Sequence, residues 1–221
     1  MTTEQQAKPK INELNKFTIF ANAPGAEGRR SRIAWSIRDG NPRITVYTNI
    51  PSDNVNYGII SAPMNPETFY AFLELFEKVI HGESDVKYKI ECYTSIPDKD
   101  GKYTDKTLLS DVIFGKDANG VVWISVVSGN RPKIKFELKI SDYHKIFHGN
   151  GNVFTESEAS ALQAMALVKA LRATYYQYTN GFRQPGNGTN SVSAKPSAAT
   201  YSSNNTQDNK AKDIDFEDIQ F

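Results

Sequence analysis

The stretch RSRIAWSIRDGNPRITVYTNI, residues 30–50, decides the fold class. Apolar and polar residues alternate on both sides of a short turn that contains Gly40. Alternation with a period of two predicts a half-buried strand, and two such runs around a tight turn predict an antiparallel hairpin. We expect one face to carry Ile33, Trp35, Ile37, Ile44 and Val46. The other face then carries Arg32, Ser36, Arg38, Arg43, Thr45 and Tyr47.

Two further hairpins and two helices extend this pattern along the chain. The expected strands are Val86–Ile96 with Tyr103–Phe114, Val121–Ser128 with Pro132–Ile140, and a shorter one over Thr18–Ala21. Asn65 followed by Pro66 predicts the start of a helix that runs to about residue 80. Thr155 and Glu158 form a capping box, which predicts a second helix to about residue 176. The sequence therefore predicts a mainly β fold, a small antiparallel barrel with one inserted and one C-terminal helix.

The composition divides the chain into three parts. Apolar and aromatic residues recur throughout residues 1–179, which we expect to form the folded domain. Residues 180–211 are mostly Gly, Asn, Ser, Thr, Ala, Pro and Gln. Such a segment cannot bury enough apolar surface to offset the entropy of ordering it, so we expect a flexible linker. In residues 212–221 apolar residues return among acids, and we expect a disordered acidic tail.

The totals of charged residues and cysteine limit the class of protein. The 221 residues include 26 Lys and Arg against 25 Asp and Glu, so the chain as a whole is not basic. No apolar run approaches the roughly 20 residues of a membrane span, and no signal-peptide pattern follows Met1. The single cysteine, Cys92, excludes an internal disulfide and a cysteine-rich zinc site. We therefore expect a cytoplasmic protein without metal, cofactor or membrane partner.

The outward strand faces repeat one combination, cations with an occasional aromatic ring. Lys and Arg can pair with phosphates while rings stack on open bases, which suits single-stranded nucleic acid. The candidate binding residues are Arg30, Arg32, Arg38, Arg43, Tyr47, Lys87, Lys89, Tyr93, Trp123, Arg131, Lys133 and Lys135. Outward lysines also commonly serve only to solvate a strand face and protect its edge. Trp123 lies in a run that is apolar on both faces, so it either stacks on bases or belongs to a core.

Candidate catalytic residues are few. His144 and His148 lie four residues apart, but the glycines that follow favour a loop over a zinc-binding helix. A carboxylate metal site of a nuclease would have to use Asp98, Asp100, Asp105 and Asp111. The first two fall in a turn, where Asp is common. The chain has no nucleophile elbow, P-loop or dinucleotide motif, so we predict no catalytic or metal-binding residue and a protein that is not an enzyme.

The last nine residues, DIDFEDIQF, place apolar side chains among acids, and such side chains need a pocket on a partner. This ending resembles that of single-stranded DNA-binding proteins. Bacterial members end in an acidic stretch with Asp-Phe near its start and Ile-Pro-Phe at its end, and Gln220 here replaces the proline. Members from tailed phages also end in acids and a terminal aromatic residue, and their barrel can carry a helix between its third and fourth strands. The residues that carry the resemblance are Asp213, Asp215, Phe216, Glu217, Asp218, Ile219 and Phe221.

The resemblance implies an OB-fold barrel that binds single-stranded DNA without reading its sequence. It also implies a tail that recruits a polymerase, helicase or primase in DNA replication, recombination or repair. If the protein is phage-encoded, it would act in the cytoplasm of the bacterial host. The residues leave two other classes open, an adaptor of a replisome or virion whose sheet binds protein, and the nuclease named above. They also leave open whether the chain forms a homo-oligomer.

Overall fold

The computed structural model describes residues 17–181 apart from 24, 26, 39, 96–100 and 104. Its strands are β1 (Ile19–Ala21), β2 (Ser31–Arg38), β3 (Asn41–Tyr47), β4 (Ile59–Pro63), β5 (Val86–Thr94), β6 (Thr107–Lys116), β7 (Val122–Val127) and β8 (Phe136–Glu137). A short 3-10 turn, η2 (Val55–Gly58), precedes β4. The helices are α1 (Pro66–His81) and α2 (Glu156–Gly181). The predicted mainly β class with two helices is confirmed.

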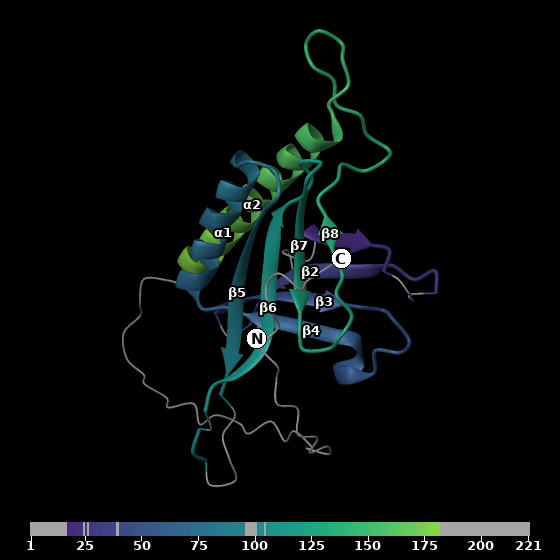
Figure 1. Ribbon diagram of the computed structural model, residues 1–221. Coiled ribbons are helices and arrows are strands. Elements are labelled where there is room, and N and C mark those ends of the chain that lie inside the picture. The colour runs from purple at the N-terminus through teal and green to yellow at the C-terminus, as the bar shows by residue number, and fades with distance from the viewer. Residues whose placement is uncertain are drawn as a thin grey trace, which may run out of the picture.

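The strands form two antiparallel sheets of four strands each. Sheet A has the order β1-β2-β3-β4 and sheet B the order β5-β6-β7-β8, and the strands of one sheet run across those of the other (Figure 1). β1 lies beside β8, and β4 lies beside β6, where Ser110 Oγ donates to the carbonyl of Ser61 at 3.0 Å. Within the described part of the chain, no strand of sheet A pairs with a strand of sheet B. The pairing thus gives two sheets and does not close a barrel.

The inner faces of both sheets and the two helices share one apolar core. Its largest fully buried side chains include Trp35, Phe69, Phe72, Phe76, Phe114, Phe136 and Tyr175. The rings of Phe72 and Phe114 meet edge to face with centroids 5.1 Å apart, a favoured aromatic geometry. Ile33, Ile44 and Val46 are fully buried, as the alternation in the first hairpin predicts.

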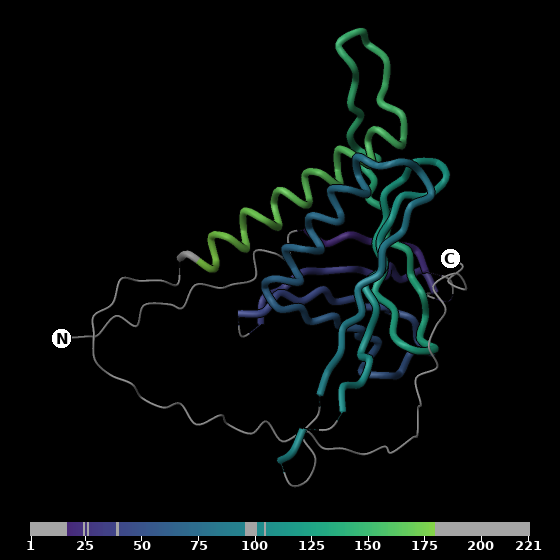
Figure 2. Tube along the Cα trace, turned by 60° about the vertical axis from the view of Figure 1, so that its left-hand side comes forward, coloured from purple at the N-terminus to yellow at the C-terminus, as the bar shows by residue number. Residues whose placement is uncertain are grey.

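Both helices begin where their capping residues predict. Asn65 Oδ1 accepts a hydrogen bond from the Thr68 backbone N at 2.9 Å. The backbone N of Glu158 donates to Thr155 Oγ1 at 3.3 Å, while Glu158 Oε2 accepts from the backbone N of Thr155 at 2.8 Å. The two helices lie side by side over the sheets (Figure 2), and Arg172 of α2 bonds Glu74 of α1 at 2.9 Å. Capping is a local signal, which is why the sequence reveals it.

Some strand boundaries differ from those expected. β4 was not expected, because a five-residue strand that ends in Pro63 gives a weak signal by itself. The strand expected over Pro132–Ile140 reduces to the two residues of β8, although Ile134, Phe136 and Leu138 are buried as the alternation predicts. The turn expected at 97–101 lies mostly outside the described residues, as do almost all of the linker and all of the tail.

Candidate nucleic-acid interface

The outer face of sheet A carries an aromatic and basic row. The register pairs Phe20 of β1 with Arg32 of β2, Arg32 with Tyr47 of β3, and Tyr47 with Ile59 of β4. These four side chains therefore lie across the sheet in one line, on the face opposite the core. We call Phe20, Arg30, Arg32 and Tyr47 the basic aromatic row, since Arg30 immediately precedes β2 and reaches the same end of the sheet.

Guanidinium groups and rings are already in contact within this row. The Arg32 Cζ lies 4.0 Å from the centroid of the Tyr47 ring, and the Arg30 Cζ lies 5.4 Å from that of Phe20. Both arginines are exposed, and Phe20 keeps 49% of its surface exposed although it is a phenylalanine. Stacked cations and rings hold each other in place and leave charge and apolar surface together in solvent.

All charged side chains on the outer face of sheet A are basic. Its side chains are Phe20, Arg32, Ala34, Ser36, Arg38, Asn41, Arg43, Thr45, Tyr47, Ile59, Ser61 and Pro63, with no acid among them. Arg43 Nη1 donates to Ser61 Oγ at 3.2 Å. Neither Arg30 nor Arg32 forms an ion pair with any residue that the structure describes. Among the described residues, no acid therefore neutralises Arg30 or Arg32, which can pair with an anion.

Two candidate cations of sheet B, Lys89 and Lys135, are placed differently, because acids accompany them. Lys89 Nζ lies 2.7 Å from Glu91 Oε1, and the Tyr93 hydroxyl donates to Glu91 Oε2 at 2.5 Å. These bonds lower the pKa of Glu91, so the carboxylate stays ionised and neutralises its neighbour. Lys135 pairs with Asp117 at 2.8 Å and with Glu137 at 3.2 Å. Lys87 is exposed and Lys133 half-buried.

Trp123 belongs to a second, smaller apolar cluster. Its ring is 4% exposed and packs with Ile113 and Val127 on the outer side of sheet B. Gly115 makes room for it, since a Cβ there would lie 3.2 Å from Trp123 Cζ2. Of the two alternatives that the sequence left open, burial in a core describes the position of this side chain.

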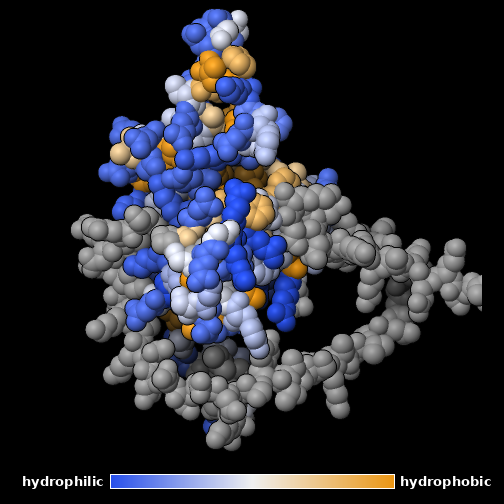
Figure 3. All heavy atoms as spheres, turned by 90° about the vertical axis from the view of Figure 1, so that its right-hand side faces the viewer, coloured by the Kyte–Doolittle hydropathy of each residue, from blue (hydrophilic) through white to orange (hydrophobic). Residues whose placement is uncertain are grey.

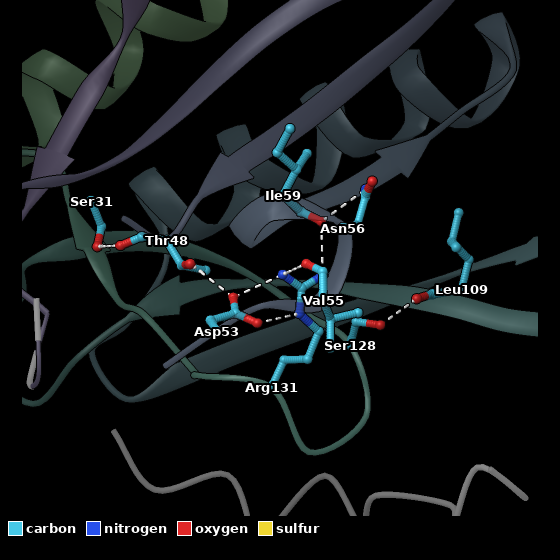
Figure 4. A network of polar contacts seen from close by, with 9 residues as sticks. All are labelled: Ser31, Thr48, Asp53, Val55, Asn56, Ile59, Leu109, Ser128 and Arg131. Carbon is cyan, nitrogen blue, oxygen red and sulfur yellow. Dashed lines mark hydrogen bonds and ion pairs between the residues drawn. The ribbon is translucent and has the colours of Figure 1, made fainter. Parts of the chain in front are cut away.

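Arg131 lies in an interior network (Figure 4). Its Nε and Nη2 donate to the two carboxylate oxygens of Asp53 at 3.1 and 2.8 Å, with the side chains 12% and 2% exposed. Its Nη1 and Nη2 also donate to the carbonyls of Ile59 and Val55, at 2.7 and 2.9 Å. The guanidinium thus donates four hydrogen bonds within the protein, and we leave Arg131 out of the candidate interface.

Asp53 stays charged within this network. Burial alone would raise the pKa of its carboxyl, but hydrogen bonds from Arg131 and Thr48 outweigh that effect and lower it. The Thr48 hydroxyl donates to Asp53 Oδ2 at 2.8 Å. The network fixes the loop between β3 and β4 against the turn that follows β7, two segments 78 residues apart in sequence.

Two side chains at this end of sheet A were missed by the sequence reasoning. Phe20 lies in a three-residue strand, where alternation is too short to assign a face. Tyr57 lies in η2, outside every expected strand, and is 95% exposed. A solitary aromatic beside glycine and asparagine in a loop was the only available signal for Tyr57.

An arm projects from the opposite end of the molecule. It runs from Ser141 to Phe154, is closed by a β-bridge between Phe147 and Val153, and stands at the top of Figure 3, where apolar side chains gather. Tyr143, Phe147 and Val153 are its exposed apolar residues. His148 stacks on Phe154 with centroids 4.2 Å apart and lies 3.4 Å from Glu158, so it packs against the start of α2.

The described residues among those considered for catalysis form no common site. Asp98 and Asp100 lie outside the described residues, and Asp111 is buried on sheet B, where burial raises the pKa of its carboxyl. Among the described residues, no group of three His, Cys, Asp or Glu side chains could hold a metal ion. In the same part of the chain, neither helix has the length and apolar character needed to span a bilayer.

Comparison with known proteins identified no relative of this chain. No family model, curated protein or solved structure matches the chain. The tail residues Asp213, Asp215, Phe216, Glu217, Asp218, Ile219 and Phe221 lie outside the described residues. The outer face of sheet A and the sequence of the tail are therefore the two features of the chain that bear on its function.

Proposed function

We propose that the protein binds single-stranded DNA without sequence preference through the outer face of sheet A. The observation that carries the proposal is the basic aromatic row, in which Arg30 and Arg32 lie against Phe20 and Tyr47 on a face without acids. Guanidinium groups neutralise phosphates, and exposed rings stack on bases whose faces are open in a single strand. Base pairs in a duplex are closed to such stacking, so the row favours single strands.

The proposed fold is an OB-like barrel. Two observations support an OB-like barrel. In the chain, α1 lies between two sets of antiparallel strands, and in space β4 approaches β6 and β1 approaches β8. In such a barrel the outward strand faces and adjoining loops hold oligonucleotides. The proposal includes the role in DNA replication, recombination or repair, with residues 213–221 as a docking peptide for replication proteins, because acids and a terminal ring complement a basic groove with an apolar pocket.

A replisome or virion adaptor is the second candidate function. The exposed apolar side chains of the arm, Tyr143, Phe147 and Val153, favour it, since clustered exposed apolar residues mark protein interaction sites. In that case the arm and not sheet A would be the principal interface.

Fluorescence anisotropy with labelled poly-dT and with duplex of equal length, at several salt concentrations, tests the proposal. We expect tighter binding of the single strand. Replacing Arg30 and Arg32 together with alanine should lower the slope of log affinity against log salt by about 1.4, at about 0.7 for each lost contact to a single strand. Lys135→Ala is the matched control, because acids already neutralise that lysine. Equal affinity for both DNA forms, or an unchanged slope in the double variant, would refute the proposal.

A further inference from the structure

The turn before β4 displays a tyrosine in an unfavourable backbone conformation. Asn56 and Tyr57 have φ values of 47° and 54°, so two consecutive residues other than glycine adopt the left-handed region. That region is costly for a side chain with a Cβ and is rarely used by neighbouring residues. The Tyr57 side chain is 95% exposed, so packing of its ring offsets none of this cost. Backbone strain of this kind clusters at functional positions, where the surrounding structure maintains it.

The surrounding network maintains this conformation. Arg131 donates to the carbonyls of Val55 and Ile59, on either side of the strained pair, at 2.9 and 2.7 Å. Asn56 Nδ2 donates to the carbonyl of Ile59 at 3.2 Å. The carbonyl of Gly58 accepts from the backbone N of Thr48 at 2.8 Å, which ties the turn to β3.

Gly58 shows how closely the turn is fitted. Its φ is +72°, and a Cβ at this position would lie 2.9 Å from Thr48 Oγ1. That hydroxyl donates to Asp53, the carboxylate that holds Arg131. The turn that carries Tyr57 is thus fixed by both its backbone and a buried ion pair, and Figure 4 shows the network around Asp53 and Arg131.

Tyr57 stands at the same end of sheet A as the basic aromatic row. Ile59 pairs with Tyr47, the last residue of β3, and the bond between Thr48 and Gly58 continues that ladder by one step. Asn49 Nδ2 donates to the carbonyl of Arg30 at 2.7 Å, so the loop after β3 also holds the start of β2. A single strand of DNA that crosses the basic aromatic row from β1 towards β4 would next meet η2.

We propose that Tyr57 is a preorganised platform that stacks on one base of the same single strand, with Arg131 and Asp53 as positioning residues. The inference rests on the proposed function and extends its site beyond the sheet. The backbone of Tyr57 is already fixed in the free protein. Binding therefore does not pay the entropy of ordering η2, which preserves affinity.

Titration of labelled poly-dT with Tyr57→Ala, Tyr57→Phe and Tyr143→Ala is the test. Stacking contributes about 1–3 kcal/mol per base, so Tyr57→Ala should weaken binding by about 5- to 150-fold without changing the salt slope. Tyr57→Phe keeps the ring and should bind like the parent. Tyr143 is a matched control, since it is 94% exposed but lies on the arm, and its replacement should have no effect.

The outcomes separate this inference from the proposed function. If the parent prefers poly-dT and Tyr57→Ala binds as tightly as the parent, the inference is wrong and the proposed function stands. If the parent shows no preference for the single strand, both are wrong. A loss in Tyr57→Phe equal to that in Tyr57→Ala would also overturn stacking, because the ring remains.

A separate measurement tests whether Arg131 positions Tyr57. Arg131→Gln should weaken binding when Tyr57 is present and have no effect in the Tyr57→Ala background, because the arginine acts through the tyrosine. Equal losses in both backgrounds would show that Arg131 does not act through Tyr57. Far-ultraviolet circular dichroism of each variant shows whether it is folded. If Arg131→Gln does not fold, the Tyr57 variants still test stacking.

Discussion

Replacing Arg131 with leucine should destabilise the fold strongly. The arginine donates four hydrogen bonds, two of them to Asp53, and the change leaves that carboxylate buried with only the Thr48 hydroxyl among the side-chain donors shown in Figure 4. Removing one partner of a buried ion pair costs about 3–5 kcal/mol, because the remaining charge is uncompensated. For a domain of this size, about 2–4 °C per kcal/mol gives a fall in melting temperature of about 6–20 °C.

Urea denaturation monitored by circular dichroism measures the loss directly. Arg30→Leu is the control, since Arg30 is exposed and forms no ion pair within the described part of the chain, and its effect should stay within about 0.5 kcal/mol. Combining Asp53→Asn with Arg131→Leu should cost less than the sum of the two single changes, because the orphaned charge is removed. If Arg131→Leu and the parent unfold at the same urea concentration, the network does not stabilise the fold.

The same pair predicts a dependence on pH. Hydrogen bonds from Arg131 and Thr48 outweigh burial and lower the pKa of Asp53 in the folded state, so its contribution is complete above the ordinary carboxyl pKa of about 4. As the pH falls through the lower folded-state pKa, Asp53 becomes protonated and the contribution is lost. The difference in stability between the parent and Arg131→Leu should therefore shrink on acidification. A difference that persists until the parent itself unfolds would contradict this reasoning.

Cys92 should resist alkylation in the folded protein, because burial and nearby Asp111 raise the pKa of its thiol to about 11; labelling at pH 8 should appear only as urea unfolds the chain, and rapid labelling without urea would show the thiol to be accessible. Removing residues 213–221 should leave the melting temperature unchanged, because residues 180–211 before them are mostly Gly, Asn, Ser, Thr, Ala, Pro and Gln, a composition poor in the apolar side chains of a core. Phe221→Ala should reduce capture of replication proteins from a bacterial extract while DNA affinity stays constant; equal recovery by parent and variant would contradict a docking role.

Signals confined to a few neighbouring residues made much of the fold predictable. The first hairpin was recognisable because its alternation is regular on both sides of a glycine turn, and Ile33 and Ile44 are buried accordingly. The helix starts were recognisable because Asn65 and the pair of Thr155 and Glu158 cap within three residues. The division into two sheets depends on contacts between distant strands and was not recognisable.

The candidate site was also predictable only where neighbouring residues carry the signal. Arg32 and Tyr47 could be assigned to one outward face from alternation alone, and the register confirms that they are neighbours. Arg131 has the same local sequence character as an exposed turn arginine. Its partner Asp53 is 78 residues away, and only the folded chain shows that its charge is already neutralised. The sequence likewise gives no indication that Tyr57 adopts a left-handed conformation.

The packing of α2 has a consequence for synthesis on the ribosome. The hydroxyl of Tyr175 donates to the carbonyl of Gly40, 135 residues earlier, and its ring lies in the core between the helices and the first hairpin. At about 5–20 residues per second, the hairpin therefore waits about 7–27 s after its own synthesis for this contact. During that interval the nascent apolar face is open to chaperones and to other nascent chains. Chains released before α2 is complete are expected to aggregate.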